Sequence, residues 1–349
     1  MLQRILKKVH KKFVYFIDIH YLYAVLPIKP TVMNILKFNA QFPDENACIA
    51  HFKAHRDAIG VVCPKCGSEE HYWLKGKLRY ECKHCHYRQS LRSGTVMEHS
   101  KLPFLYWYVA MHLLTSTKKS FSAAELQRQL GHKRYQPIWE LCKKLHDIMG
   151  KRDDNYKLGG QVELDNAFIT TLIPDCQKNE KLKRGAGSQK QSKVVVMTES
   201  AFVANSKPDK KPKRVNHIKM VVIDDLMADT LTNVVKEQVE TDTELTTDDS
   251  TSYTKLGEYV KSHQAQVVKP EDIPKILPWV HIAIGNVKRL LLDIHHQLSK
   301  EYLQYYLNEF CYKFNRRYFG DKIFDRLIVA AVSYNAGFKS RIYNRSLCG

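Results

Sequence analysis

Several features are absent or scarce in this 349-residue chain, and each absence narrows what the protein can be. We find no internal repeat, which argues against a solenoid or a propeller. Nine cysteines are too few for a disulfide scaffold in a chain of this length. Four of them form two tight pairs and the other five are scattered, a pattern that suits a reducing cytosol. The apolar run at residues 13–26 is too short to span a bilayer, and Asp18 and His20 interrupt it. Since no small-residue cleavage site follows it, we expect no transmembrane or secretory segment and a cytoplasmic location.

Acidic residues are in the minority. The chain has 55 Lys plus Arg against 36 Asp plus Glu, which gives a net charge of +19 and an isoelectric point near 9.4. Such an excess attracts polyanions, and nucleic acid is the commonest large polyanion in a cell. The alternative is a globular protein that happens to be basic. A hydrophobic share of 44% argues against wholesale disorder, and the length allows two or three modest domains.

Residues 1–32 carry a basic stretch, but no core or capping pattern ties them to the rest of the chain. The sequence from Met33, MNILKFNAQFPDE, reads like the natural start of a protein. Our hypothesis is that translation begins at Met33 and that residues 1–32 are a non-native or dispensable arm. Residues 33–60 then form an N-terminal helical segment, with an amphipathic helix expected over residues 44–58.

Four of the nine cysteines form two Cys-x-x-Cys pairs that are fifteen residues apart. Two such pairs at this distance place four sulfur atoms tetrahedrally around one zinc ion, and a site filled entirely by protein ligands is structural. His84 and His86 could in principle replace a cysteine, but the regular spacing favours four sulfurs. The residues between the pairs alternate as in a hairpin. We therefore predict a zinc ribbon over residues 61–92, with the ligands Cys63, Cys66, Cys82 and Cys85.

Residues 100–150 have the pattern of a helix-turn-helix-like DNA-binding region. A helical region opens at Pro103, which suits a first helical turn. Ser122 and Glu125 have the spacing of a capping box, and the helix that they begin should end at Gly131. A second helix then carries an apolar face made of Ile138, Leu141, Cys142, Leu145 and Ile148.

The second half of the chain contains strands and helices after a boundary near residues 150–160. A helix is expected at 227–239, and strand-like runs lie at 161–164, 193–197, 217–223, 244–247 and 264–268. The last third is helical, and Ser299 begins a helix with a clean apolar stripe. The basic segment 206–214 should be an exposed hairpin loop and is a candidate DNA contact. This pattern predicts an α/β domain over residues 158–335 and a tail over residues 336–349.

Three polar residues of this second half are candidates for a metal-dependent active site. Asp165 follows the strand 161–164, and Asp248 follows the strand 244–247. Asn286 is expected at the start of a helix. Acidic residues at the ends of two adjacent strands, with a polar residue from a following helix, can hold two Mg²⁺ ions over a phosphodiester. Such a pair activates water or a 3′-hydroxyl for in-line attack.

A structural role is the alternative for each of these residues. An aspartate after a strand is more often a turn or cap residue than a ligand, and asparagine is a common helix cap. Glu163 shares a strand face with Asp165 and could assist, but an ion pair with a neighbour is the better interpretation. Asp224 and Asp225 form a rival pair at another strand end, which we rank below the others.

Together these motifs resemble the ISXO-type insertion-sequence transposases over about residues 42–319. The resemblance rests on FPDENACIAHF, the double Cys-x-x-Cys, LQRQLG, GGQVELD, KRGAGSQKQSK and LTTD followed by SY. Its most specific part is HIAIGNVKRLL joined to LQYYLNEFCYKFNRR. It implies a multidomain α+β protein with a zinc ribbon, the helical region and a DDE-type catalytic domain. That domain would have a ribonuclease-H-like α/β fold with a mixed central sheet.

The resemblance also implies roles for single residues. The first and second aspartates of the family fall on Asp165 and Asp248. In the subgroup that this chain resembles, asparagine replaces the usual glutamate, and it falls on Asn286. Asp249 stands where the family usually has glycine, and Asn166 stands where glutamate is usual. Beside structural zinc, the implied cofactor is catalytic Mg²⁺, or Mn²⁺, held by Asp165, Asp248 and Asn286.

The implied activity is that of a transposase, a polynucleotidyl transferase that binds terminal inverted repeats and then cleaves and transfers DNA strands. Its expected partners are the double-stranded DNA of element ends and target, and further copies of itself on DNA. We expect no membrane partner, and association with the nucleoid when DNA is bound. The alternatives are a non-catalytic zinc-ribbon DNA-binding regulator and an inactivated or domesticated transposase. The basic residues expected to contact DNA are Lys133, Arg134, Arg184, Lys288, Arg289, Arg316 and Arg317.

Overall fold

The computed structural model describes residues 33–203, 213–267, 276–295, 297–320 and 322–338. The hypothesised arm over residues 1–32 lies outside the described residues, as do most of the basic segment 206–214 and most of the tail 336–349. Within the described ranges, no helix has the length and apolar character needed to cross a membrane.

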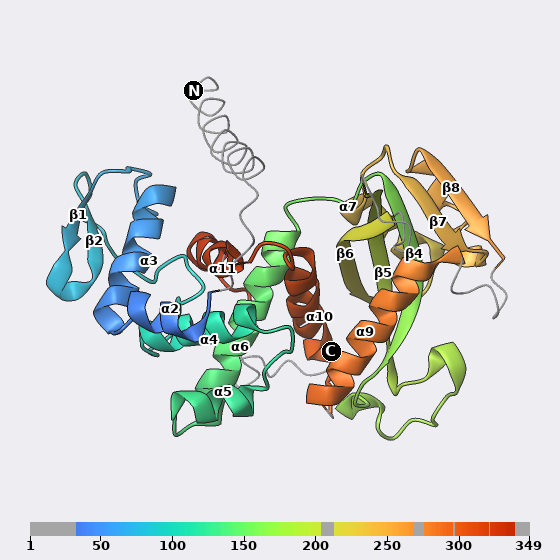
Figure 1. Cartoon of the computed structure of the whole chain (residues 1–349), viewed down its shortest axis with the longest axis horizontal. Coiled ribbons are helices and arrows are strands. Elements are labelled where there is room, and N and C mark those ends of the chain that lie inside the picture. The colour runs from blue at the N-terminus through green and yellow to red at the C-terminus, as the bar shows by residue number, and fades with distance from the viewer. Residues whose placement is uncertain (1–32, 204–212, 268–275, 296, 321, 339–349) are drawn as a thin grey trace. The chain divides into compact units, whose positions relative to one another are not determined.

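Two capped helices open the described chain (Figure 1). Asn34 Oδ1 accepts a hydrogen bond from the Lys37 amide at 2.9 Å. Asp44 Oδ1 accepts one from the Ala47 amide at 2.8 Å. Each side chain thus satisfies an amide that the helix leaves unpaired. The second helix confirms the one predicted over residues 44–58. The two are α2 (Ile35–Gln41) and α3 (Glu45–Ile59).

A three-stranded antiparallel sheet follows, and its first hairpin confirms the alternation predicted between the cysteine pairs. Trp73 lies opposite Tyr80 across this hairpin, with 4.8 Å between the ring centroids. Tyr80 Oη donates to Asp57 of α3 at 2.7 Å, so the small sheet is attached to the helix before it. In spatial order the strands are β1 (His71–Leu74), β2 (Arg79–Cys82) and β3 (Arg88–Ser90), and a 3₁₀ turn spans Lys75–Lys77.

A helical bundle contains α4 (Phe104–Ser116), α5 (Ala123–Leu130), α6 (Tyr135–Asp153) and, from the far end of the chain, α11 (Lys322–Ser333). Ser122 Oγ accepts from the Glu125 amide at 3.1 Å, and Gly131 ends α5 with φ at 61°, which glycine adopts without strain. The predicted helices are confirmed. Helix α11 falls within residues 158–335, yet its Phe324 belongs to the same core as Trp107 of α4.

A five-stranded mixed sheet organises the second half, with strands β4 (Gln161–Thr170), β5 (Gln191–Phe202), β6 (Lys213–Ile223), β7 (Glu244–Asp248) and β8 (Ser262–Gln266). Their spatial order is β6-β5-β4-β7-β8. Strands β4, β5 and β6 pair antiparallel, whereas β4, β7 and β8 pair parallel. Every predicted strand-like run overlaps one of these strands. The predicted α+β class with a mixed central sheet is confirmed.

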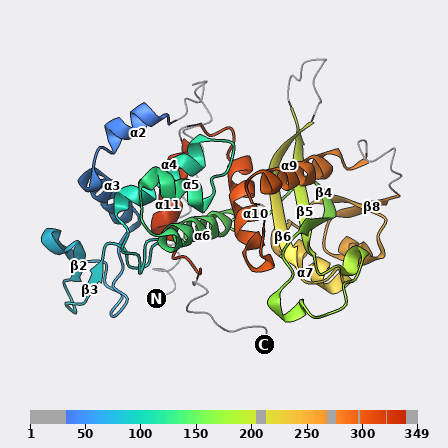
Figure 2. The same cartoon turned by 90° about the horizontal axis from the view of Figure 1, so that it is seen from below.

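Helices cover both faces of this sheet, α7 (Ala228–Gln238) on one and both α9 (Pro278–Ile294) and α10 (Lys300–Asn315) on the other (Figure 2). Side-chain alternation along β4 explains the division. Val162 and Leu164 join the core beneath α7. Ala167 and Ile169 join the core beneath α9 and α10. Further 3₁₀ turns span Asp175–Gln177, Gly185–Gly187, Thr251–Tyr253 and Leu256–Glu258.

Candidate active site

Asp165 and Asp248 lie level with each other on neighbouring parallel strands. Strand β4 pairs with β7 with Glu163 opposite Thr246. The same register, continued by two residues, brings Asp165 opposite Asp248. Because side chains alternate along a strand, Asp165 shares its face with Ala167, which packs beneath α9. Both carboxylates therefore face the same helix.

The position of Asp165 corrects one expectation. It is the fifth residue of β4 and not the residue after the strand. The strand continues to Thr170 because its other edge pairs with β5, where Asp165 lies opposite Val196. Pairing with β7 ends earlier, at Glu163. Asp165 thus lies where β4 loses one neighbour and keeps the other. Asp248 is the last residue of β7, close to where the sequence placed it.

Burial raises the pKa of both carboxyl groups. The side chain of Asp165 is 17% exposed. Burial raises its pKa most, and the charge of Asp248 raises it further. The Asn166 amide, His281 and Lys288 act in the opposite direction. Burial likewise raises the pKa of Asp248, and His281 again opposes the change. The two carboxylates therefore repel each other in a partly desolvated site. Basic side chains of α9 partly offset their negative charge.

Glu163 fixes the start of α9 above these carboxylates. Its Oε2 accepts hydrogen bonds from the amides of Trp279 at 2.8 Å and Val280 at 3.0 Å. A carboxylate at this end of a helix is stabilised by the unpaired amides and by the helix dipole. The next residue, His281, has its Nδ1 3.7 Å from Asp165 Oδ2. The contribution of Glu163 to the site is therefore to hold α9 in place.

His281 was not singled out by sequence reasoning. The signal that could have found it is its spacing to Lys288, since seven residues make nearly two full helical turns and return to the same side of the helix. Both residues act on the pKa of Asp165. The structure thus places one imidazole and one ammonium beside the pair of aspartates.

Asn286 lies in the middle of α9, which corrects the expectation that it opens a helix. The helix begins at Pro278, because proline suits a first turn and Glu163 caps the amides that follow. Asn286 Oδ1 accepts a hydrogen bond from Arg289 Nη2 at 2.9 Å. Five residues separate Asn286 from His281, so the two side chains leave the helix about 140° apart. Asn286 is therefore on a different side of α9 from His281 and Lys288.

The donor set of the two aspartates fits a hard divalent cation. Asp248 Oδ1 is buried, and it has no hydrogen-bond partner in the part of the chain that the structure describes. A buried carboxylate oxygen without a partner is costly unless a cation or water satisfies it. Carboxylate oxygens are also the ligands that Mg²⁺ prefers. Asp165 and Asp248 are thus the residues that would hold such an ion.

Asn166, where the resembled family usually has glutamate, faces the opposite side of the sheet. Its Nδ2 donates to Tyr253 Oη at 2.5 Å. Tyr253 is 1% exposed and ends the 3₁₀ turn that follows β7. Asn166 therefore connects β4 to the segment after Asp248, and its side chain does not point toward Asp165.

The four cysteines converge as predicted. Their sulfur atoms all lie within 4.8 Å of one another. Cys63 Sγ is 3.5 Å from Cys85 Sγ, and Cys66 Sγ is 3.5 Å from Cys82 Sγ. The cluster contains neither His84 nor His86. Four thiolates in this arrangement form a structural zinc site.

Comparisons with known families match both halves of the chain. A family described as "Transposase zinc-ribbon domain" matches residues 43–88, which contain the four cysteines. A family described as "ISXO2-like transposase domain" matches residues 157–315, which contain Asp165, Asp248 and Asn286. The chain belongs to the ISXO2-like transposases. A comparison with curated proteins gives no match.

The rival acidic pair of this transposase has structural partners. Asp225 Oδ1 accepts from the Met227 amide at 2.9 Å and from Thr230 Oγ1 at 2.7 Å, which fixes the start of α7. Asp224 is 91% exposed at its side chain and pairs with Lys300 at 2.9 Å. The lower rank given to this pair agrees with these contacts.

Most basic residues expected to contact DNA lie on the surface of the transposase, but Arg316 does not. Its guanidinium is 2.5 Å from Asp153, with both side chains less than a tenth exposed. It also donates to the Tyr312 carbonyl at 3.3 Å. We therefore remove Arg316 from the expected DNA contacts, because it is buried between α6 and α10. The residues that are exposed are Lys133, Arg134, Arg184, Lys288 and Arg289.

Proposed function

We propose that this transposase cleaves DNA and transfers strands at a centre formed by Asp165 and Asp248, with Mg²⁺ or Mn²⁺ as the cofactor. The observation that carries the proposal is the register of β4 and β7, which sets the two carboxylates level on one face beneath α9. The buried and unpartnered Asp248 Oδ1 supports it. When bound, such a cation supplies activation of water or a 3′-hydroxyl and stabilisation of the leaving oxygen.

The side chains of α9 provide positive charge beside the carboxylates. Lys288 is exposed and lies on the same side of the helix as His281, so it can neutralise a phosphate that approaches Asp165. Asn286 remains the proposed third ligand on the strength of the family resemblance. To serve in this role, its amide has to leave Arg289 and turn toward the aspartates.

We further propose that the zinc ribbon and the α5–α6 pair recognise the terminal inverted repeats. Lys133 and Arg134 lie exposed in the turn between these two helices. Cations at such a turn can contact phosphates while one helix lies in the major groove. Further copies of the transposase on the DNA would bring two ends together.

A strand-transfer assay with DNA carrying the gene's own flanking ends tests the catalytic proposal. Asp165→Asn and Asp248→Asn are expected to abolish cleavage and strand transfer with Mg²⁺ while DNA binding persists. Asp224→Asn is the matched control, because Asp224 is an exposed strand-end aspartate with a surface partner. Its activity should equal that of the unchanged protein.

The same assay distinguishes the alternatives. Wild-type protein that binds the ends specifically but never cleaves them with either metal would be a regulator or an inactivated transposase. Cleavage that survives both Asp165→Asn and Asp248→Asn would place the active site elsewhere.

A further inference from the structure

A second surface of the transposase combines exposed aromatic rings with cations at the end of the β5–β6 hairpin. Phe202 is 68% exposed and Tyr318 is 63% exposed. Rings this open contribute little to a core, whereas they are suited to contact a ligand. We define the hairpin-end surface by its residues Phe202, Lys213, Arg214, Arg317 and Tyr318.

Two groups of ring–cation contacts make up this surface. Lys213 lies opposite Phe202 across the hairpin, and its Nζ is 4.8 Å from the centroid of the Phe202 ring. The guanidinium of the next residue, Arg214, is 5.7 Å from the Tyr318 ring. That of Arg317 is 4.5 Å from the same ring. Because successive side chains of a strand point to opposite faces, the Phe202–Lys213 pair lies on one face of the hairpin end and Arg214 extends toward Tyr318 from the other.

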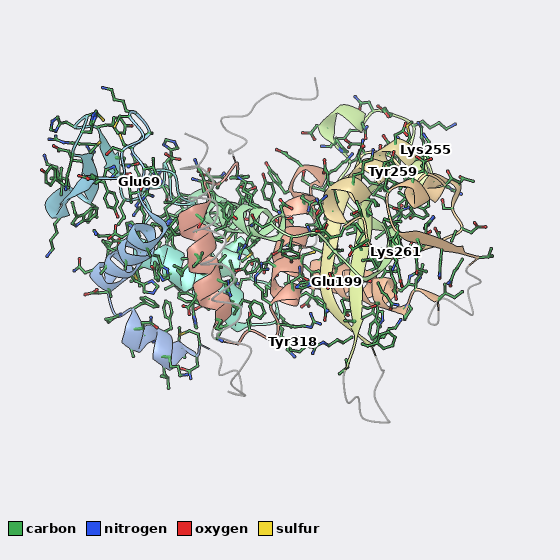
Figure 3. All side chains as sticks on the ribbon, turned by 90° about the horizontal axis from the view of Figure 1, so that it is seen from above. Glu69, Glu199, Lys255, Tyr259, Lys261 and Tyr318 are labelled. Atoms are coloured by element: carbon green, nitrogen blue, oxygen red, sulfur yellow. The ribbon has the colours of Figure 1, made fainter. Side chains whose placement is uncertain are left out.

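Arg317 fixes the turn after α10 to this strand. Its guanidinium donates to the Phe314 carbonyl at 2.8 Å and to the Asn216 carbonyl at 3.4 Å, and it also donates to the Val215 carbonyl. Tyr318 follows directly in the chain, so these bonds hold it beside the hairpin end (Figure 3). The surface is thus built on a strand and an anchored turn.

The positive charge of this surface is not neutralised by acidic side chains of the described ranges, and the Arg317 guanidinium, although bonded to carbonyls, keeps its charge. In the described ranges, no carboxylate forms an ion pair with Lys213, Arg214 or Arg317. Glu199 is the acidic residue of β5, further along the strand from the hairpin end (Figure 3). Its carboxylate accepts from the Gly159 amide at 3.1 Å and contacts His217 at 3.2 Å. An anionic partner would therefore find uncompensated positive charge at the hairpin end.

The hairpin-end surface is separate from the candidate active site. Val196 of β5 lies opposite Asp165, and Phe202 is six residues further along β5. At the usual rise per residue of a strand, this places the surface roughly 20 Å from Asp165. A ligand here would not occupy the active site itself.

The exposed ring of Phe202 distinguishes between single-stranded and double-stranded nucleic acid as the ligand. The cations alone would suit the phosphates of a duplex. A phenyl ring, however, has no polar atom to offer a phosphate, and the bases of a duplex are already stacked on one another. Unpaired bases have free faces that stack on aromatic side chains, and cations beside the rings contact their phosphates. We propose that the hairpin-end surface binds single-stranded DNA. The inference rests on the proposed function only for the source of the strand, which cleavage at an element end would release.

Binding of a fluorescent oligothymidylate of on the order of ten nucleotides tests the inference by anisotropy with the full chain. Phe202→Ala and Tyr318→Ala should each raise the Kd about tenfold, the change expected for loss of one stacked base. Tyr318→Phe should keep the wild-type Kd, because the ring remains. The matched control is Tyr259→Ala at a different surface, where Lys236 Nζ lies 3.9 Å from the ring of Tyr259 (Figure 3). Its Kd should not change.

Two results would overturn the inference. One is an oligothymidylate Kd that neither ring variant changes. The other is equal weakening for a duplex of the same length, which would show a surface for duplex backbone. Asp165→Asn separates the inference from the proposed function, since it should abolish strand transfer and leave oligothymidylate binding intact. If the wild-type protein shows no strand transfer, but its oligothymidylate binding depends on the two rings, the inference about the hairpin-end surface would stand and the catalytic proposal would be wrong.

Discussion

Strand register and side-chain alternation bring single residues together at the candidate site. Asp165 and Asp248 are far apart in sequence, yet parallel pairing of their strands sets them level on one face. Glu163, two residues before Asp165 on the same face, fixes α9 over both. The helical repeat then brings His281 and not Asn286 toward Asp165. Each of these placements follows from backbone periodicity.

Asn286 provides the first prediction at this scale. If its amide oxygen binds the metal ion, Asn286→Ser should reduce strand transfer on the order of a hundredfold, because the serine hydroxyl is too short to reach the ion. Strand transfer is measured with Mg²⁺ and with Mn²⁺ at equal DNA binding. Arg289→Ala is the comparison variant, since it removes the present partner of Asn286 and keeps the amide; because Arg289 is also an expected DNA contact, it too is compared at equal DNA binding. Normal strand transfer by Asn286→Ser would remove Asn286 from the active site and leave it as the partner of Arg289.

Among the elements, the folding of the zinc ribbon depends most on a few residues, its four cysteines. Its three strands are short, and the four sulfur atoms supply the centre around which they fold. Its larger apolar residues, such as Tyr80 and Leu91, pack into the core shared with α3 and α4. Metal binding therefore has to supply much of the folding free energy of the ribbon itself.

Cys63→Ser should lose zinc and unfold residues 61–92 while the sheet with Asp165 stays folded. Zinc content is measured by elemental analysis, and local unfolding by amide hydrogen exchange. Cys142→Ser is the matched control, because Cys142 is a buried cysteine of α6 outside the cluster. It should keep its zinc. Wild-type protein that contains no zinc after purification without chelator would contradict the prediction.

The α5–α6 turn is the second element with a testable role. Replacing Lys133 and Arg134 with Ala should weaken binding to the end sequence and lower the slope of log K against log salt by about two, one for each lost phosphate contact. Gel-shift titrations over a range of salt measure both quantities. Lys236→Ala with Lys255→Ala, on the surface that contains Tyr259, removes the same charge and should have little effect. A wild-type affinity that does not change with salt would argue against DNA as the partner.

At the scale of the whole molecule, α6 and α10 connect the helical bundle to the sheet. Arg316 at the end of α10 pairs with Asp153 at the end of α6. Asn315 Nδ2 donates to the same aspartate at 3.0 Å, and Asn315 Oδ1 accepts from the Ile218 amide of β6 at 2.8 Å. A buried network thus ties the last turns of both helices to the edge strand of the sheet.

Asp153→Ala should lower the free energy of unfolding by about 3–5 kcal/mol, since it leaves Arg316 as an uncompensated buried charge. Urea denaturation followed by circular dichroism measures the change. The control is Asp229→Ala, which breaks the exposed pair between Asp229 and Lys255 and should have a much smaller effect. Equal effects of the two variants would show that the Asp153–Arg316 pair is not buried in solution.

Local signals in the sequence were sufficient for most elements. Helix α5 begins after its cap Ser122 and ends at Gly131, which has a left-handed conformation. Both signals depend on neighbouring residues alone. The Cys-x-x-Cys spacing likewise predicts the cluster, because each pair is a single tight turn. The start of α9 was misplaced because its cap, Glu163, comes from a distant strand. The end of β4 was misplaced because pairing with β5 extends it.

The sequence by itself determined the zinc ligands, the helices with their own caps, the strand-like runs and the family of this transposase. Tertiary structure alone decided which faces meet. Register sets Asp165 beside Asp248, and the packing of α9 brings His281 to them in place of Asn286. Tertiary packing also buries Arg316 against Asp153, although the sequence shows only two consecutive arginines at the end of a helix. The physical reason is that caps, turns and periodicity act over a few residues, whereas burial and pairing depend on segments that meet only in the folded chain.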